Sequence, residues 1–372
     1  MLRRITTVRL AENCGAILLF AVVVLVSVAG ANSNAGQGAK KTKTKGDGHP
    51  ANPGKPAGSG GYHLLKTVPL GGEGGWDYLI VDSDARRIYI ARATHTMVLD
   101  ADSLGVVGDI PDTQGVHGIA LVPEFGRGFT SNGRSANVTI FDPKTLKVIG
   151  TAKTGERPDA IIYDPASKRV FTFNAGSKNA TAIDASTGNV VGEIPVGGKP
   201  EFAAADGNGH VYVNIEDTAE IVDIDSQNLK ELHRWKMSGC EEPSGLAMDV
   251  KNRRLFSACS NKVMNVVNAD SGQVVGTVPI GSGVDAAAFD PAEALAFSSN
   301  GDGTLTVIHE DSPDKFSVVE TVRTKSGART LALDKKTHTV YLPAAEFEPL
   351  AAGQKGRPKM VANSFQLLVV GK

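Results

Sequence analysis

Cysteine and aromatic residues are scarce in this sequence, and it has no long apolar run beyond its first 30 positions. Its 372 residues include 3 Cys and 2 Trp, and aromatic residues make up 6%. A Cys-x-x-Cys-His segment is absent, which excludes covalent c-type haem, and neither His-x-His nor Cys-x-x-Cys spacing marks a local metal site. Any chemistry in this chain must therefore combine residues that lie far apart in the sequence.

An excess of basic residues is also missing from most of the chain. The net charge of the whole chain is −1, and residues 1–60 contribute +6, which leaves −7 for residues 61–372. Nucleic acid binding requires a basic surface to meet the phosphates. We therefore do not expect nucleic acid to be a partner of residues 61–372.

The N-terminal part predicts two segments that precede a folded domain. A basic start and an apolar run over 15–29 lead to a small-x-small cleavage site at 29–31, which predicts a signal peptide over 1–31. The run of about 15 residues is shorter than the ~20 that span a bilayer, so we expect no membrane span after cleavage, with an uncleaved anchor as the alternative. Residues 32–61 are rich in Gly, Lys and Pro and predict a disordered linker. The expected localisation is periplasmic or secreted.

A short motif recurs through residues 62–372 at intervals of about 42 residues. It consists of an acidic or polar residue, a small turn and a β-branched run ending near Gly, as in Leu99–Gly108. Its first positions are residues 100, 142, 184, 223, 268 and 309. Periods in the forties that combine short strands and turns are typical of propeller blades. We predict an all-β, seven-bladed β-propeller over 62–372.

The ends of this domain predict how the ring closes. Residues 364–370 match the third strand of a blade, and no fourth strand follows them. Residues 63–70 match a fourth strand and precede the first blade. We expect the N-terminal strand to pair with the C-terminal blade, because this pairing removes exposed strand edges.

An aromatic residue recurs in the second strand of every unit. One aromatic side chain at one register indicates a packing layer between neighbouring blades rather than a ligand platform. These residues are Tyr89, Phe129, Phe171, Tyr212, Phe256, Phe297 and Tyr341.

Three segments in these strands resemble a known repeat. They are Phe129-Thr-Ser-Asn132, Phe171-Thr-Phe-Asn174 and Val211-Tyr-Val-Asn214, each followed by a small turn and a strand containing Asp. They are similar to the YVTN-repeat β-propeller family, of YncE-like type, although no unit spells Tyr-Val-Thr-Asn in full. The resemblance implies a periplasmic or secreted seven-bladed propeller. A DNA-binding activity is associated with the YncE type, and the acidic charge of this domain argues against it here.

The first residue of each predicted innermost strand is polar in all seven units, but its chemistry varies. In a propeller this position lies at one mouth of the central channel. The seven residues are Asp77, His117, Asp159, Glu201, Ser244, Asp285 and Arg329. Carboxylates and imidazole suit a metal ion or a small polar ligand. Alternatively, this polarity only solvates the entrance of a water-filled channel.

A long connection lies on the same face. Residues 343–363 form a loop of 21 residues in the seventh unit, longer than the equivalent loops elsewhere. Phe347, Leu350 and Met360 could pack over the channel mouth, and Lys355, Arg357 and Lys359 offer contacts to anions. The loop is either a lid or a flexible insertion.

The remaining cysteine pair predicts a disulfide. Cys14 lies within the predicted signal peptide, which leaves Cys240 and Cys259 in an exported protein. We expect these two residues to be bridged on the channel-mouth face of the fifth blade.

We therefore predict an exported binding or scaffold protein, which we expect to be a monomer. Its polar ligand-binding funnel is formed by Trp76, Asp77, His117, Asp159, Glu201, Asp285 and Arg329. The partner would be a small polar ligand, a metal ion or a protein, and no cofactor is assigned. The alternatives are a metal-dependent or lactonase-like hydrolase that uses the same funnel, and a DNA-binding propeller.

Overall fold

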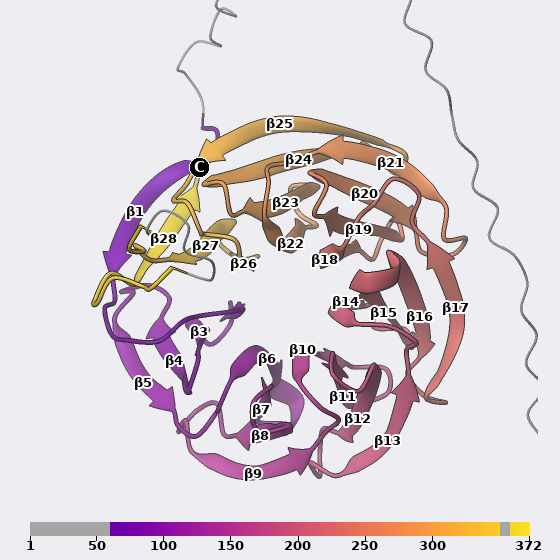
Figure 1. The fold of residues 1–372 in the computed structure, drawn as a ribbon, viewed down its shortest axis with the longest axis horizontal. Coiled ribbons are helices and arrows are strands. Elements are labelled where there is room, and N and C mark those ends of the chain that lie inside the picture. The colour runs from indigo at the N-terminus through magenta and orange to yellow at the C-terminus, as the bar shows by residue number, and fades with distance from the viewer. Residues whose placement is uncertain (1–59, 350–357) are drawn as a thin grey trace, which may run out of the picture. The chain divides into compact units, whose positions relative to one another are not determined.

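The computed structural model describes residues 60–349 and 358–372. In these residues 28 strands form seven four-stranded antiparallel sheets arranged as blades in a ring (Figure 1). The prediction of a seven-bladed β-propeller is thus confirmed. The predicted signal peptide and nearly all of the predicted linker lie outside the described residues.

Each blade runs outward from the central axis through four strands. The innermost strands are β2 (Leu79–Asp82), β6 (Val116–Val122), β10 (Pro158–Asp164), β14 (Pro200–Ala205), β18 (Pro243–Asp249), β22 (Val284–Asp290) and β26 (Ala332–Asp334). The second strands are β3 (Arg87–Arg92), β7 (Arg127–Asn132), β11 (Arg169–Asn174), β15 (His210–Ile215), β19 (Arg254–Cys259), β23 (Leu295–Asn300) and β27 (Thr339–Ala344).

The outer half of each blade is equally regular. The third strands are β4 (His95–Asp100), β8 (Asn137–Phe141), β12 (Asn179–Asp184), β16 (Glu220–Asp225), β20 (Val263–Asn268), β24 (Thr304–Ser312) and β28 (Gln366–Gly371). The outermost strands are β5 (Val106–Ile110), β9 (Val148–Lys153), β13 (Val190–Pro195), β17 (Lys230–Lys236), β21 (Val274–Pro279), β25 (Lys315–Arg323) and β1 (His63–Pro69).

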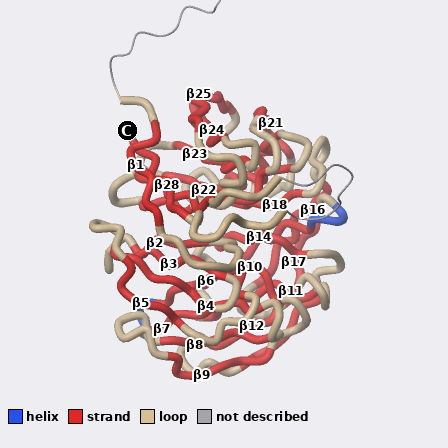
Figure 2. Tube along the Cα trace, turned by 60° about the vertical axis from the view of Figure 1, so that its left-hand side comes forward, coloured by secondary structure: helices blue, strands red, loops and turns tan. Residues whose placement is uncertain are grey.

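Helical structure in the described residues is confined to two 3-10 turns, Pro123–Phe125 and Glu216–Thr218, as the blue segments of Figure 2 show. Neither is long or apolar enough to cross a membrane, and no other helix in the described part of the chain offers a candidate span.

The ring is closed by the two ends of the domain. The seventh blade has the strand order β1-β28-β27-β26, with β1 antiparallel to β28 from His63 opposite Gly371 to Pro69 opposite Gln366. Figure 1 shows the indigo β1 beside the yellow β28. The predicted closure is confirmed, and it joins strands from opposite ends of the sequence.

The recurrent aromatic residues form the packing between blades. Six of the seven have no exposed surface, and Tyr341 is 3% exposed. Phe256 of blade five stacks on Phe289 of blade six, with 5.1 Å between ring centroids. Tyr89 of blade one packs against Phe141 of blade two at 5.9 Å. The structural role predicted for this position is confirmed.

The recurrent acidic residue closes the turn between the third and fourth strands. Asp142 Oδ1 accepts hydrogen bonds from the backbone N–H groups of Lys144 and Thr145, an arrangement typical of an Asx turn. In blade four this role belongs to Asp225, which accepts from Gln227 and Asn228. The prediction that the motif of this blade starts at Asp223 was therefore wrong by two residues. Asp223 points elsewhere and receives a hydrogen bond from His210.

The asparagine that ends the second strand holds the next turn in place. Asn132 is fully buried, and its Nδ2 donates to Asn137 Oδ1 and Thr139 Oγ1, 2.8 Å away in each case. Asn174 makes the equivalent pair of bonds in blade three. Because these turns lie on the face that carries the predicted funnel, the buried amide fixes the rim of that face.

Cys240 and Cys259 are joined by a disulfide, with their Cα atoms 5.4 Å apart. Cys240 precedes β18, and Cys259 ends β19, so the bridge ties the entry loop of blade five to its second strand.

Candidate functional site

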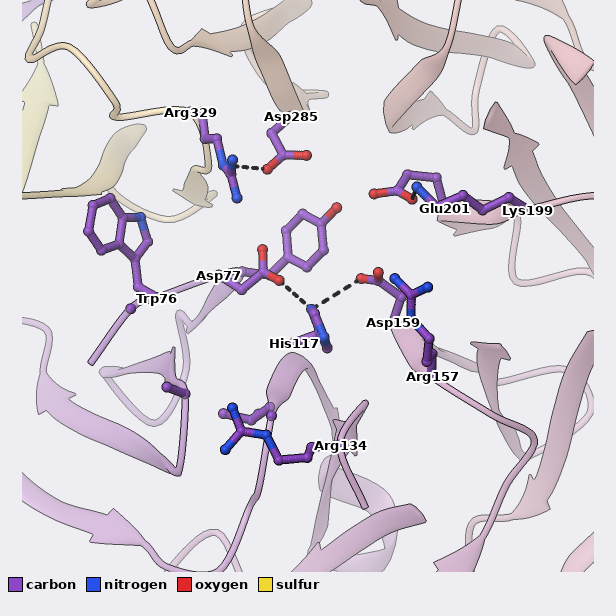
Figure 3. Close-up of a pocket in the computed structure, with 15 residues that line it drawn as sticks. Trp76, Asp77, His117, Arg134, Arg157, Asp159, Lys199, Glu201, Asp285 and Arg329 are labelled. Atoms are coloured by element: carbon purple, nitrogen blue, oxygen red, sulfur yellow. Dashed lines mark hydrogen bonds and ion pairs between the residues drawn. The ribbon is translucent and has the colours of Figure 1, made fainter. Parts of the chain in front are cut away.

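Six of the seven predicted ring residues line one cavity at the mouth of the central channel. This cavity has a volume of about 490 Å³ and is mainly polar. Its predicted lining residues are Trp76, Asp77, His117, Asp159, Glu201, Asp285 and Arg329, and Figure 3 shows their side chains converging from different blades. The structure thus brings all seven of the predicted funnel residues together.

Ser244, the remaining ring position, is not among the residues that line the cavity. Its Oγ donates to the carbonyl oxygen of Val284 in the next blade at 3.2 Å. A serine side chain is short enough to bond the neighbouring backbone. Ser244 therefore occupies the ring position of its blade without lining the cavity.

A β-bulge turns these side chains toward the channel mouth. The pairing of the innermost strand with the second strand shifts register between Pro158 and Ile161, between Pro200 and Ala203, and between Val284 and Ala286. Asp159, Glu201 and Asp285 lie within these shifts. Bulges are common next to functional sites because they redirect a side chain without ending the strand. The same irregularity places His117, between Val116 and Ile119 of β6.

His117 connects two of the carboxylates. Its Nδ1 lies 2.5 Å from Asp77 Oδ2 and 3.6 Å from Asp159 Oδ1 (Figure 3). Burial alone would lower the pKa of His117. The hydrogen bond that His117 donates to Asp77 and the attraction of the Asp159 and Asp77 carboxylates outweigh burial and raise this pKa to about 9. At neutral pH the imidazole is therefore protonated and lies between Asp77 and Asp159, whose own pKa burial raises to about 6.

The backbone of the neighbouring turn makes room for this imidazole. A Cβ atom at Gly133 would lie 2.8 Å from His117 Nε2. A larger residue at position 133 would push the ring toward the channel, so this glycine is part of the site through its lack of a side chain.

The opposite side of the cavity holds the other two carboxylates. Arg329 Nε lies 2.8 Å from Asp285 Oδ2, and Lys199 Nζ lies 3.4 Å from Glu201 Oε2. Lys199 also donates a hydrogen bond to Glu216, so its charge is divided between two acids. Burial raises the pKa of Asp285, although Arg329 opposes this shift.

Glu201 is the least satisfied of the four acids. Its Oε2 is buried and accepts no hydrogen bond among the described residues, although Lys199 Nζ lies 3.4 Å away as an ion-pair partner. Burial raises the pKa of Glu201 well above its usual range, and repulsion from Asp159 adds to the shift. A donor supplied from outside the chain would therefore stabilise this group.

Tyr78 forms the floor of the cavity. Its side chain is almost fully buried, and its ring meets the edge of Phe202 at a centroid distance of 4.9 Å. Below this pair the channel becomes an apolar cavity of about 360 Å³, whose lining includes Ile80, Ile162 and Leu331. The two rings thus separate a polar mouth from an apolar channel.

Four lining residues with charged or aromatic side chains were not predicted from the sequence, namely Tyr78, Arg134, Arg157 and Lys199. Two of them, Arg157 and Lys199, belong to a sequence pattern that could have identified them. Arg157-Pro158-Asp159 and Lys199-Pro200-Glu201 repeat a basic-Pro-acidic pattern at the start of two consecutive innermost strands. This repetition places a basic residue two positions before Asp159 and before Glu201, and Lys199 forms an ion pair with Glu201.

The long loop of blade seven borders the mouth through its described residues. Phe347 pairs with Met360 in an isolated β-bridge and packs on Trp76, with 5.9 Å between ring centroids. These three residues, with Pro358 and Arg329, line a second cavity of about 380 Å³. Its lining is mainly apolar. The predicted contacts of Leu350, Lys355 and Arg357 lie outside the described residues.

Asp77, His117 and Asp159 form one group that could hold a metal ion. One ligand atom from each residue lies within 4.8 Å of the other two. Two carboxylates and an imidazole are a suitable set for Zn²⁺ and similar divalent ions, with the cavity side open to water. In the arrangement described here, His117 Nδ1 contacts Asp77 directly, so a bound ion would replace the proton that they share.

Comparison with known proteins identifies the fold and no more. No family model and no curated protein matches this chain. A chain in the crystal structure of a mitotic checkpoint complex has a TM-score of 0.69 at 14% identity, covering 90% of this chain and 99% of that chain. The WD40 repeats of RRP9 give 0.67 at 10% identity over 82% of this chain and 96% of theirs.

A bacterial structure shows the same similarity. A chain of hydrazine synthase from Kuenenia stuttgartiensis has a TM-score of 0.64 at 15% identity, covering 74% of this chain and 92% of that chain. Together these neighbours define the class of protein as a seven-bladed β-propeller with WD40-like structure. They carry no information about the residues at the channel mouth.

Proposed function

We propose that this protein is an exported binding protein of the YVTN-repeat, YncE-like type, and that its channel mouth binds a small polar ligand. One observation carries the proposal. Charged residues from separate blades converge on a single cavity, where the buried oxygen Oε2 of Glu201 has no hydrogen-bond partner among the described residues. Ligand cavities typically have about 300–1,000 Å³ and a few convergent polar groups, and this cavity fits that description.

Binding accounts for the charge pattern better than DNA recognition does. Residues 61–372 carry a net charge of −7, and the mouth itself contains four carboxylates. Four Arg or Lys residues line the same cavity, so the charges of the mouth roughly balance and it offers no basic surface to a phosphate backbone. The proposed ligand is therefore small enough to enter the mouth rather than a polyanion lying across the ring.

Native mass spectrometry of the mature protein, purified from its export compartment without chelator, tests the proposal. A panel of amino acids, sugars, organic acids, amines and divalent metal ions would be screened in parallel by thermal shift. We expect one class to bind stoichiometrically and to lose affinity in Asp159→Asn. Ser244→Ala is the matched control, because it changes a ring position that does not line the cavity. An empty protein that binds no member of the panel would refute the proposal.

Export is tested separately. We expect the mature protein in a periplasmic or secreted fraction to begin near Asn32, after the small-x-small site. N-terminal sequencing of that fraction measures this directly. A chain that retains Met1 in the membrane fraction would show an uncleaved anchor instead.

A further inference from the structure

The polar mouth cavity and the apolar cavity beside it adjoin one another. Both are lined by Gly75, Trp76 and Arg329. A ligand in the mouth can therefore extend past these residues without leaving the surface of the protein. The chemistry of the two ends then limits what such a ligand can be.

The polar end favours a cation. Asp285 has the guanidinium group of Arg329 2.8 Å away. Asp77 and Asp159 share the imidazole of His117. Glu201, in contrast, shares the ammonium group of Lys199 with Glu216. An ammonium group beside Glu201 would supply a hydrogen-bond donor to this carboxyl group and reduce the repulsion between Glu201 and Asp159.

The two remaining arginines of the mouth do not reverse this preference. Arg134 and Arg157 are exposed, and water solvates their guanidinium groups. A group already in water gains little from a ligand of opposite charge, whereas a buried acceptor without a partner gains a full hydrogen bond. The buried acid therefore contributes more to ligand selection than the exposed bases do.

The apolar end favours an aromatic or alkyl group. Trp76, Phe347 and Met360 present the indole, phenyl and thioether groups to the second cavity. Phe347 is 42% exposed, which is high for a large apolar side chain, and a ligand would cover it. Trp76 is fixed from behind by Phe365, at a centroid distance of 5.5 Å, so one wall of this cavity is rigid.

We infer that the ligand is an organic amine with an apolar tail, whose ammonium group binds between Glu201 and Asp159 and whose tail lies against Trp76, Phe347 and Met360. This inference rests on the proposed function, because it names the ligand class of the same mouth cavity. It adds the second cavity as part of the site and assigns the blade-seven loop a role in specificity.

Four probes that differ in one feature at a time test the inference by isothermal titration calorimetry. Phenylbutylamine has both features, n-butylamine lacks the ring, phenylbutanol lacks the charge, and phenylbutyrate reverses it. We expect phenylbutylamine to bind at least about tenfold more tightly than each of the other three, since a charge-assisted hydrogen bond and a buried ring each contribute about 1.5 kcal/mol or more.

Two variants separate the ends of the site. Glu201→Gln should weaken phenylbutylamine and n-butylamine alike, by about tenfold. Phe347→Ala, in an exposed loop, should weaken phenylbutylamine about fivefold and leave n-butylamine unchanged. Ser244→Ala should bind all four probes as the unchanged protein does. Far-UV circular dichroism and the melting temperature verify that each variant is folded.

The outcomes distinguish this inference from the proposed function. Tighter binding of phenylbutyrate than of phenylbutylamine would overturn the amine assignment and leave a binding site at the mouth. Equal affinity for phenylbutylamine and n-butylamine would overturn the role of the second cavity. If neither these probes nor any member of the wider panel binds, the inference and the proposed function both fail.

Discussion

The guanidinium group of Arg92 lies over the ring of Phe365, with Cζ 3.6 Å from the ring centroid. Arg92 ends the second strand of blade one, and Phe365 immediately precedes β28 of blade seven, so this contact joins the two blades at which the ring closes. The same guanidinium donates to the carbonyl oxygens of Glu73 and Gly74, in the loop that leads to Trp76. One buried side chain therefore contacts both the closing blade and the loop that leads to Trp76.

Replacing Arg92 by Ala should destabilise the protein and weaken binding at the mouth. The side chain is 1% exposed, so its loss leaves a cavity and removes the hydrogen bonds to the entry loop. We expect a loss of about 2–4 kcal/mol in the free energy of unfolding. Urea denaturation measures this loss.

Arg323→Ala is the control for this prediction. Arg323 is exposed on β25 of blade six, and its removal should change stability by less than about 0.5 kcal/mol. Equal effects of the two substitutions would show that the Arg92 contacts do not hold the ring together.

His117→Gln should have an effect on stability that depends on pH. The pKa of His117 is raised to about 9 from 6.5, so its charged pairing stabilises the fold fully below about pH 6.5 and is lost as pH rises through 9. Because its side chain is 35% exposed, we reduce the expected loss near pH 6 to about 1–2 kcal/mol. The loss should be much smaller at pH 10.

Chemical denaturation of both proteins at pH 6, 8 and 10 provides the measurement. His63→Gln, on the exposed strand β1, is the control and should show no such trend. A destabilisation that stays constant across this pH range would mean that the imidazole packs in the site without carrying charge.

The fold could be predicted because each blade repeats the same local signals. Phe171 marks a packing position and Asp184 marks a turn, and each acts within its own blade or on the next one. Where the repeat is degenerate, the predicted position of the turn residue was wrong by two residues. Val222-Asp223 resembles the motif as well as Asp225 does, and only hydrogen bonding separates them.

The site was partly predictable for the same reason. One polar position per blade must lie near the axis, which located Asp159 and Glu201 from the sequence. The missing information concerns the bulges and the lining residues outside the ring positions. No sequence pattern showed that Ser244 would bond the neighbouring backbone, or that Tyr78, one position after Asp77, would become the floor.

Removing the disulfide should reduce stability without changing the fold. Cys240 and Cys259 are 19 residues apart, and closing a loop of that length restricts the unfolded chain by about 3 kcal/mol. Cys240→Ser with Cys259→Ser should lower the free energy of unfolding by that amount and keep ligand affinity. Dithiothreitol should destabilise the unchanged protein similarly and leave the double variant unaffected. An unchanged midpoint in dithiothreitol would show that this bridge does not stabilise the protein.

Glu201→Gln should stabilise the ligand-free protein increasingly as pH rises. Burial and the repulsion from Asp159 raise the pKa of Glu201 in the folded state above its unfolded value of 4.5. A group with a raised pKa destabilises the folded state progressively as pH increases above the unfolded value, because ionisation is easier in the unfolded chain. Glutamine keeps the shape of the side chain and does not ionise.

The measurement is the difference in unfolding free energy between Glu201→Gln and the unchanged protein, in the absence of ligand, at pH 4, 7 and 9. Glu193→Gln, on the exposed strand β13, is the control. We expect the difference to favour glutamine more strongly at each higher pH. If glutamine is instead less stable at pH 9, the ion pair with Lys199 outweighs the cost of burying the charge, and Glu201 does not need a donor from a ligand. Any weakening of amine binding by Glu201→Gln would then have a cause other than the supply of a hydrogen-bond donor to Glu201. This result would therefore count against an amine as the ligand of the mouth.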